Sequence, residues 1–228
     1  PMEKWDHCAF ATSEDDLEGR VCYGGLDLSS TTDITAFVLV FPPLDEDDKY
    51  VILPYFWIPE ENMGQRVNRD HVPYDVWERQ GFLQTTEGNV VHYGYIEKFI
   101  EQLGERFNIR EIAFDRWGAV QMVQNLEGMG FTVVPFGQGF KDMSPPTKEL
   151  MKLVLEEKIA HGGHPVLRWM MDNIYIRTDP AGNIKADKEK STEKIDGAIA
   201  TIMGLDRAIR CGNDTGASVY DSRGLLFI

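Results

Sequence analysis

The order in which strand-like and helix-like segments follow one another constrains this fold more than any other feature of the sequence. Three strand-like runs come first, at residues 21–28, 35–41 and 50–57, and short connections rich in turn-forming residues separate them. This spacing predicts an antiparallel meander. Two further apolar strands, at residues 111–115 and 131–136, each follow a helix-like segment, which predicts crossover connections to parallel strands.

The helix-like segments predict helices on both faces of a mixed five-stranded sheet. Apolar residues recur in them at helical spacing, and proline or glycine marks several of their ends. The predicted helices are 95–107, 119–129, 146–159, 165–173 and 195–209, with two short helices broken at Pro73 within 60–80 and a β-hairpin insertion of 174–177 with 183–186. This order is that of the α/β ribonuclease H-like fold, which the RuvC resolvase and retroviral integrases share.

The expected domain organisation is a single ribonuclease H-like domain at residues 21–210. Residues 1–20 have no clear period and predict a tail or linker, and residues 211–228 predict an irregular C-terminal tail. The three cysteines, Cys8, Cys22 and Cys211, form no CxxC pair, which indicates a reducing cytoplasm. No apolar run approaches the roughly 20 residues that a membrane span needs, and no signal peptide is recognisable.

Three aspartates lie where this element order brings them to one edge of the sheet. Asp27 is near the end of the first strand, Asp115 ends the strand EIAFD, and Asp196 begins the last helix in KIDGAIA. The first and fourth strands are neighbours in the predicted sheet, and the first turn of the last helix can reach the same edge. Each aspartate alone also has a structural reading, because aspartate forms turns and complements the dipole at a helix N-terminus.

Three carboxylates at one edge predict a metal site. They repel one another, and hard cations such as Mg²⁺ or Mn²⁺ relieve the repulsion by taking oxygen ligands. Two such ions roughly 4 Å apart can activate water and stabilise the leaving oxygen of a phosphoryl displacement. We therefore predict a phosphodiester hydrolase with two divalent ions, in which Asp27, Asp115 and Asp196 are the catalytic and metal-binding residues.

Basic residues gather just before the third of these aspartates. They are Arg177, Lys185, Lys188, Lys190 and Lys194. Such residues can contact DNA phosphates and guide a strand toward the metals. Acidic residues interleave with them, however, so a solvated surface is an equally acceptable reading.

Three stretches carry a resemblance to a known family. They are GLDLSSTTDITA, FDRWGA, and a long run from PPTKELMKLVLEEKIAHGGHPVLRWM to KIDGAIATIMGLDRAI. They resemble the C-terminal nuclease domain of the large terminase subunit, the DNA-packaging motor of tailed bacteriophages. The last stretch is the most specific, because its helix, HPVLRWM, hairpin and KIDGAIA occur in family order. The resemblance covers about residues 21–210.

The resemblance implies an endodeoxyribonuclease that cleaves double-stranded viral DNA during genome packaging in the host cell cytoplasm. It implies Asp27, Asp115 and Asp196 as metal ligands, and Asp33 as an auxiliary acidic residue, although SSTTD also reads as a simple turn. The implied partners are double-stranded DNA, an ATPase domain, a small terminase subunit and the portal. No GxxxxGK[ST] phosphate loop occurs, which predicts either the nuclease half of a terminase or a stand-alone version.

The net charge of −14 argues against tight DNA binding by this chain alone. Proteins that hold DNA unaided usually present a basic face, because neutralising phosphates drives affinity. Three alternatives stay open beside a terminase nuclease: a resolvase or transposase of the same fold, an actin-like ATPase or sugar kinase related through GGLDLSSTTDITA, and a non-catalytic motor-docking module. The ATPase and kinase class needs a second glycine-rich phosphate loop, which the sequence lacks.

Overall fold

A computed structural model of the chain describes residues 1–28, 34–115 and 119–214. Its strands are β1 (Val21–Asp27), β2 (Thr35–Phe41), β3 (Tyr50–Pro59), β4 (Gln84–Thr86), β5 (Asn108–Asp115), β6 (Val133–Phe136), β7 (Ile159–Ala160), β8 (Ile176–Thr178) and β9 (Ile184–Ala186). Its helices are α1 (Met2–His7), α2 (Met63–Asp70), α3 (Tyr74–Arg79), α4 (Tyr93–Arg106), α5 (Val120–Gly128), α6 (Phe140–Leu155), α7 (Pro165–Asn173) and α8 (Asp196–Cys211), with a 3₁₀ turn at Glu14–Leu17.

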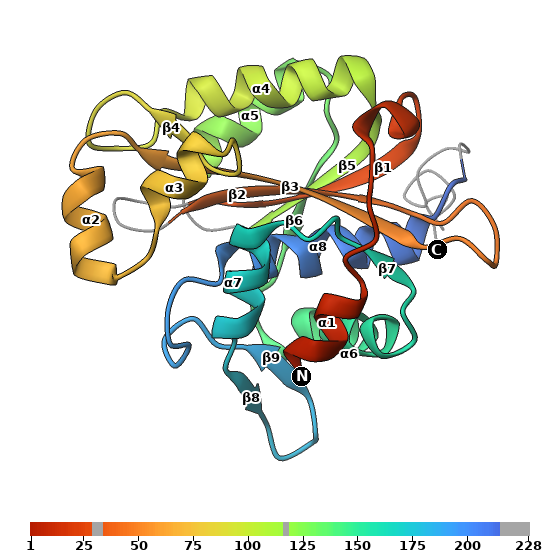
Figure 1. Cartoon of the computed structure of the whole chain (residues 1–228). Helices are drawn as coiled ribbons and strands as arrows, with labels where there is room; N and C mark the ends of the chain where they lie inside the picture. Colours follow the sequence, from red (N-terminus) through yellow and green to blue (C-terminus); the bar gives the residue numbers. More distant parts are fainter. Residues whose placement is uncertain (29–33, 116–118, 215–228) are drawn as a thin grey trace, which may run out of the picture.

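The predicted five-stranded mixed sheet forms the centre of the molecule (Figure 1). The strand order is β4-β3-β2-β1-β5-β6, and β7 pairs with β3 outside this path. β1 is antiparallel to β2 and parallel to β5, as the element order predicts. The two additional strands, β4 and β7, have three and two residues, which is too short for a recognisable alternation of apolar residues.

Helices cover both faces of the sheet, with α4 and α5 on one side and α1, α6, α7 and α8 on the other (Figure 1). All seven residues of β2 are buried for this reason. Ala36 and Val38 belong to the core beneath α8, whereas Phe37 and Leu39 belong to the core beneath α4. A strand enclosed on both faces appears in the sequence as a continuous apolar run.

The N-terminal segment differs from the predicted tail or linker. α1 packs on the body of the protein, where Trp5 stacks on His161 with ring centroids 4.1 Å apart, and Cys8 is completely buried. A helix of six residues is too short to be stable alone, so tertiary packing holds it and local periodicity does not reveal it. At the other end α8 continues to Cys211, and the predicted tail from residue 215 onward lies outside the described residues.

α6 begins at Phe140, before the predicted start at Pro146, and so contains Pro145 and Pro146. Proline inside a helix removes a hydrogen bond and usually marks a boundary. Here the extra turn is held by contacts with other elements. Met143 and Ser144 are buried, and Ser144 Oγ accepts a hydrogen bond of 3.0 Å from the backbone N–H of Ile184 on β9.

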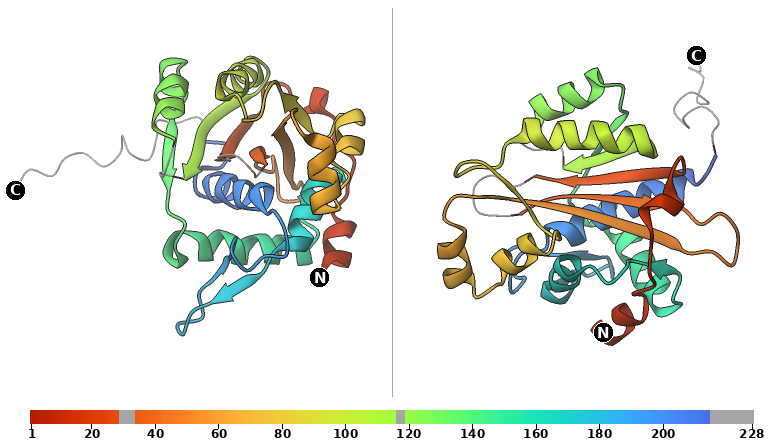
Figure 2. Two further views of the ribbon diagram at one scale, coloured as in Figure 1. Left: turned by 90° about the vertical axis from the view of Figure 1, so that its left-hand side faces the viewer. Right: turned by 45° about the horizontal axis from the view of Figure 1, so that its top comes forward.

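The hairpin β8–β9 projects from the body on the side of the sheet that α6, α7 and α8 cover; Figure 2 shows this from two further directions. Among the described residues, no helix has the length and apolar character needed to cross a membrane.

Candidate active site

Asp27 and Asp115 end two neighbouring parallel strands at the same edge of the sheet. Leu26 of β1 pairs with Phe114 of β5, so the two aspartates that follow lie side by side along the sheet. Asp27 is only 3% exposed, whereas Asp115 is partly exposed. The carboxyl ends of parallel strands are a frequent place for ligand sites in α/β proteins.

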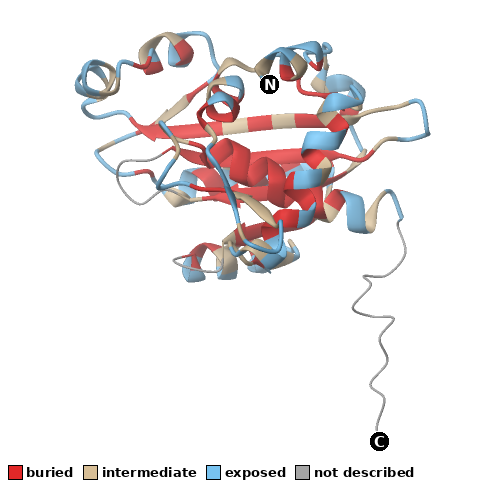
Figure 3. Cartoon of the chain, turned by 90° about the horizontal axis from the view of Figure 1, so that it is seen from below, coloured by how far each residue is buried: buried red, intermediate tan, exposed pale blue. Residues whose placement is uncertain are grey.

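α8 brings the third aspartate to this edge because its backbone lies directly against β1. A Cβ atom on Gly25 would stand 1.8 Å from the carbonyl oxygen of Ala200, so only glycine admits the helix at this distance. On the helix side, an added Cβ on Gly197 would stand 2.6 Å from the Phe56 ring, and one on Gly204 would stand 3.2 Å from the Val40 side chain. Figure 3 shows that both α8 and the central strands against which it packs are largely buried. Asp196, in the first turn of α8, is 3% exposed.

The ammonium group of Lys188 joins two of the three carboxylates. Its Nζ lies 2.6 Å from Asp27 Oδ2 and donates a hydrogen bond of 3.0 Å to Asp196 Oδ1. The contact with Asp27 is a short ion pair to an oxygen that is itself buried. Two acidic side chains that are 169 positions apart in the sequence therefore converge on one cation.

The electrostatics of the site favour a positive charge between the aspartates. Burial raises the pKa of Asp27 to about 7; Lys188 opposes the shift, and the charges of Asp196 and Asp115 add to it. Burial lowers the pKa of Lys188, but the charges of Asp27 and Asp196 outweigh it and hold that pKa above its ordinary value. Lys188 therefore stays protonated, and the buried carboxylates depend on it for compensation.

The donor set fits a hard divalent cation. Within residues 1–28, 34–115 and 119–214, no three acidic, histidine or cysteine side chains are grouped closely enough to hold a metal ion as they stand. The ammonium of Lys188, however, is a cation that already lies between two buried carboxylates. Carboxylate oxygens are the ligands that Mg²⁺ and Mn²⁺ prefer. Asp33 lies outside the described residues.

The predicted basic residues fall into three groups. Lys188 reaches into the aspartates, and Lys194 lies 3.7 Å from Asp70 with 11% of its side chain exposed. The other three, Arg177, Lys185 and Lys190, lie against aromatic rings on or beside the hairpin. The sequence did not indicate the pairing of Lys188 with the aspartates, because its spacing from Asp196 follows no regular period.

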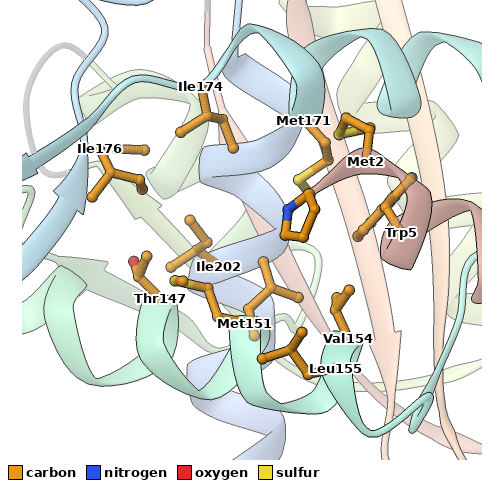
Figure 4. Close-up of a pocket in the computed structure, with 13 residues that line it drawn as sticks. Met2, Trp5, Thr147, Met151, Val154, Leu155, Met171, Ile174, Ile176 and Ile202 are labelled. Atoms are coloured by element: carbon orange, nitrogen blue, oxygen red, sulfur yellow. The ribbon is translucent and has the colours of Figure 1, made fainter.

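A separate hollow of about 240 Å³ lies between α1, α6 and α7, and Figure 4 shows apolar side chains facing into it. Its described lining has no charged side chain, and the Thr147 hydroxyl donates to the carbonyl of Met143 at 2.6 Å. In contrast, a hollow of about 220 Å³ beside the aspartates is lined by Lys188, Ser191, Glu193 and Asp196, among others. Of the three predicted aspartates, Asp196 lines the second, polar hollow, and none lines the first.

His164, one of two histidines beside Gly162 and Gly163, caps α7 and predicts a loss of stability in acid. Burial, with a smaller contribution from His161, lowers the pKa of His164 from 6.5 to about 4. The unfolded chain therefore binds this proton first, and stability present above pH 6.5 is lost as the pH falls toward 4. Between pH 7 and pH 4.5 the loss should be about 2 kcal/mol. Urea unfolding at pH 7 and pH 4.5 would measure it.

The control for this prediction is His164→Asn, which has no titrating ring and can still accept the hydrogen bond from Leu167 N. Carboxylates also respond to acid, so the difference between the two proteins isolates the histidine. Equal losses in both proteins would show that His164 does not cause the pH dependence.

Comparisons with known proteins connect this geometry with one family. A family model described as terminase large subunit, endonuclease domain, matches residues 1–211. The large terminase subunit of Enterobacteria phage HK97 is 39% identical over 191 residues, which cover 83% of this chain and 38% of that protein. The crystal structure of the HK97 large terminase matches with a TM-score of 0.82 at 37% identity, over 90% of this chain and 42% of that one.

Two more distant structures share the fold. The large terminase nuclease of thermophilic phage G20c, with bound magnesium, has a TM-score of 0.53 at 13% identity, over 83% of this chain and 84% of that one. The nuclease domain of the large terminase of bacteriophage SPP1, with bound manganese, has a TM-score of 0.52 at 14% identity, over 87% of this chain and 92% of that one. The predicted ribonuclease H-like fold is confirmed, and the chain spans about four tenths of the HK97 protein.

Proposed function

This chain belongs to the endonuclease-domain family of terminase large subunits, and from that premise we propose that it is a metal-dependent endonuclease that cleaves double-stranded viral DNA during genome packaging. The observation that carries the proposal is the convergence of Asp27 and Asp196, both buried, on one cationic group beside the end of β5. Buried carboxylates cost free energy unless a cation compensates them, so a site built this way is suited to binding cations.

We assign the divalent ions to Asp27, Asp115 and Asp196, with Asp33 as an auxiliary acidic residue. Mg²⁺ and Mn²⁺ are the candidates, and the G20c and SPP1 nucleases were determined with these ions. When bound, two such ions would activate a water molecule and stabilise the leaving oxygen of the cleaved strand. The chain itself contributes the position of the ligands: the strand ends hold Asp27 and Asp115, and the close packing of α8 holds Asp196.

The test is cleavage of plasmid DNA by the purified chain. We expect nicking or linearisation with Mn²⁺ or Mg²⁺ and none in excess chelator. Cleavage that continues in chelator would contradict the metal dependence. An inactive chain that still binds a motor component would support the docking module instead, in which the Asp27–Lys188–Asp196 contacts are purely structural.

Arg177 and Lys185 on the hairpin, and Lys190 in the turn that follows it, are proposed to contact DNA phosphates. Binding by the isolated chain should be weak and salt-dependent, because the net charge is −14. Changing Lys185 and Lys190 together to alanine should make the dependence of log Kobs on log salt shallower by about 2, one for each lost phosphate contact. Lys188 is kept, because it pairs with Asp27 and Asp196.

Fluorescence anisotropy with a labelled duplex at several salt concentrations measures this slope. The matched control is Lys98→Ala, which removes an exposed lysine from α4 on the opposite face of the sheet. Identical slopes in the Lys185/Lys190 double variant and the control would show that these two lysines do not contact DNA phosphates.

The chain spans less than half of its HK97 relative, so the wider setting is also a proposal. In it, an ATPase domain, a small terminase subunit and the portal deliver DNA to this site in the host cell cytoplasm. Delivery by partners accounts for a nuclease surface that carries a net negative charge.

A further inference from the structure

The backbone around Lys188 is fixed, although its side chain is not enclosed. The Asp187 carboxylate accepts hydrogen bonds from the backbone N–H groups of Glu189 and Lys190, at 3.0 and 3.3 Å. Ser191 Oγ donates to the carbonyl of Asp187 at 2.6 Å. The turn therefore holds the start of the Lys188 side chain in place, while 45% of that side chain's surface is exposed. Its ammonium end can change position without movement of the backbone.

The ammonium of Lys188 and a divalent ion need the same oxygens. Nζ lies 2.6 Å from Asp27 Oδ2 and 3.0 Å from Asp196 Oδ1. Mg²⁺ binds carboxylate oxygens at about 2.0–2.1 Å, so an ion on these two oxygens would stand in contact with the ammonium. Two cations at that distance repel each other strongly.

We propose that Lys188 is an internal counter-ion that occupies the cation position of the empty site and is displaced when a divalent ion binds. This inference rests on the metal site proposed above. The polar hollow beside Asp196, lined by Ser191, Glu193 and Lys194 as well as by Lys188, gives the displaced side chain room to move. The exchange keeps the buried carboxylates compensated without metal, and it raises the metal concentration that the site requires.

The test compares wild type with Lys188→Met, which keeps an unbranched side chain one atom shorter and removes its charge. Mn²⁺ affinity is measured by titration calorimetry, and the melting temperature is measured in chelator. We expect Lys188→Met to bind Mn²⁺ at least tenfold more tightly than wild type and to melt at a lower temperature in chelator. The control is Lys190→Met in the same turn, whose ammonium lies over the Tyr175 ring at 5.6 Å; it should leave the Mn²⁺ affinity unchanged.

Equal or weaker Mn²⁺ binding by Lys188→Met would overturn the counter-ion role while leaving metal binding and cleavage by the wild type intact. If Asp27→Asn binds Mn²⁺ as tightly as the wild type, the proposed metal site itself is wrong and the inference fails with it. Should Lys188→Met not fold, a crystal structure of the wild type with Mn²⁺ decides. If the Lys188 ammonium has left both carboxylates in that structure, the exchange is supported. If it still lies within about 3 Å of both carboxylates while Mn²⁺ is bound, the exchange is overturned.

Discussion

Replacing Asp27, Asp115 or Asp196 by asparagine, one at a time, is expected to slow DNA cleavage by about a thousandfold or more. Each change removes one anionic ligand from a shared cation site, and such ions supply several kcal/mol of transition-state stabilisation. A loss of about 4 kcal/mol corresponds to a factor of roughly a thousand in rate. Initial rates of plasmid nicking with saturating Mn²⁺ measure the effect, and circular dichroism shows whether each variant is folded.

The double variant Asp27→Asn/Asp196→Asn separates a shared site from independent effects. Residues that act as a unit are strongly non-additive, so the double variant should be little slower than either single variant. Asp75→Asn is the control, because Asp75 is a partly exposed carboxylate on α3 that pairs with Arg79 at 3.1 Å, far along the chain from the three aspartates. Full activity in any of the three single variants would show that the aspartate replaced in it is not a metal ligand.

Gly25→Ala is expected to destabilise the protein by about 3 kcal/mol or more and to reduce cleavage as well. The added Cβ would stand 1.8 Å from the carbonyl oxygen of Ala200, and a backbone oxygen cannot rotate away as a side chain can. Overpacking of a core costs about 1–3 kcal/mol even where side chains can adjust. α8 must therefore move off β1, and it takes Asp196 with it. A shift of about 1 Å at a catalytic group can cost roughly a hundredfold in rate.

Chemical denaturation and the nicking assay, applied to the same preparation, measure both effects of Gly25→Ala. The matched control is Gly128→Ala at the end of α5, where an added Cβ meets nothing within 4 Å. That variant should differ from wild type by no more than about 1 kcal/mol, because the change affects only backbone entropy there. Wild-type stability of Gly25→Ala would show that α8 does not depend on this close approach.

The main sheet was predictable because each of its long strands carries its own signal. β2 is a run of seven buried residues. The other long strands are separated from one another by turn-forming residues or by segments with helical spacing of apolar residues, and both signals are long enough to be recognised. The relation of Asp27 to Asp115 follows from that sheet, since both residues end neighbouring strands. α1 and the first turn of α6 were not predictable, because contacts with distant elements stabilise them against weak or opposing local preferences.

The order of the strands, the two-sided covering of the sheet and the three aspartates at its expected edge could all be predicted from the sequence. Those features depend on the spacing of apolar residues along the chain, which a sequence records directly. The positions of two lysines could not be predicted in this way: in the folded chain Lys188 lies between Asp27 and Asp196, and Lys194 lies beside Asp70. The direction of a long charged side chain depends on which opposite charges the folded backbone places within a few ångströms of it, and on how far water is excluded there.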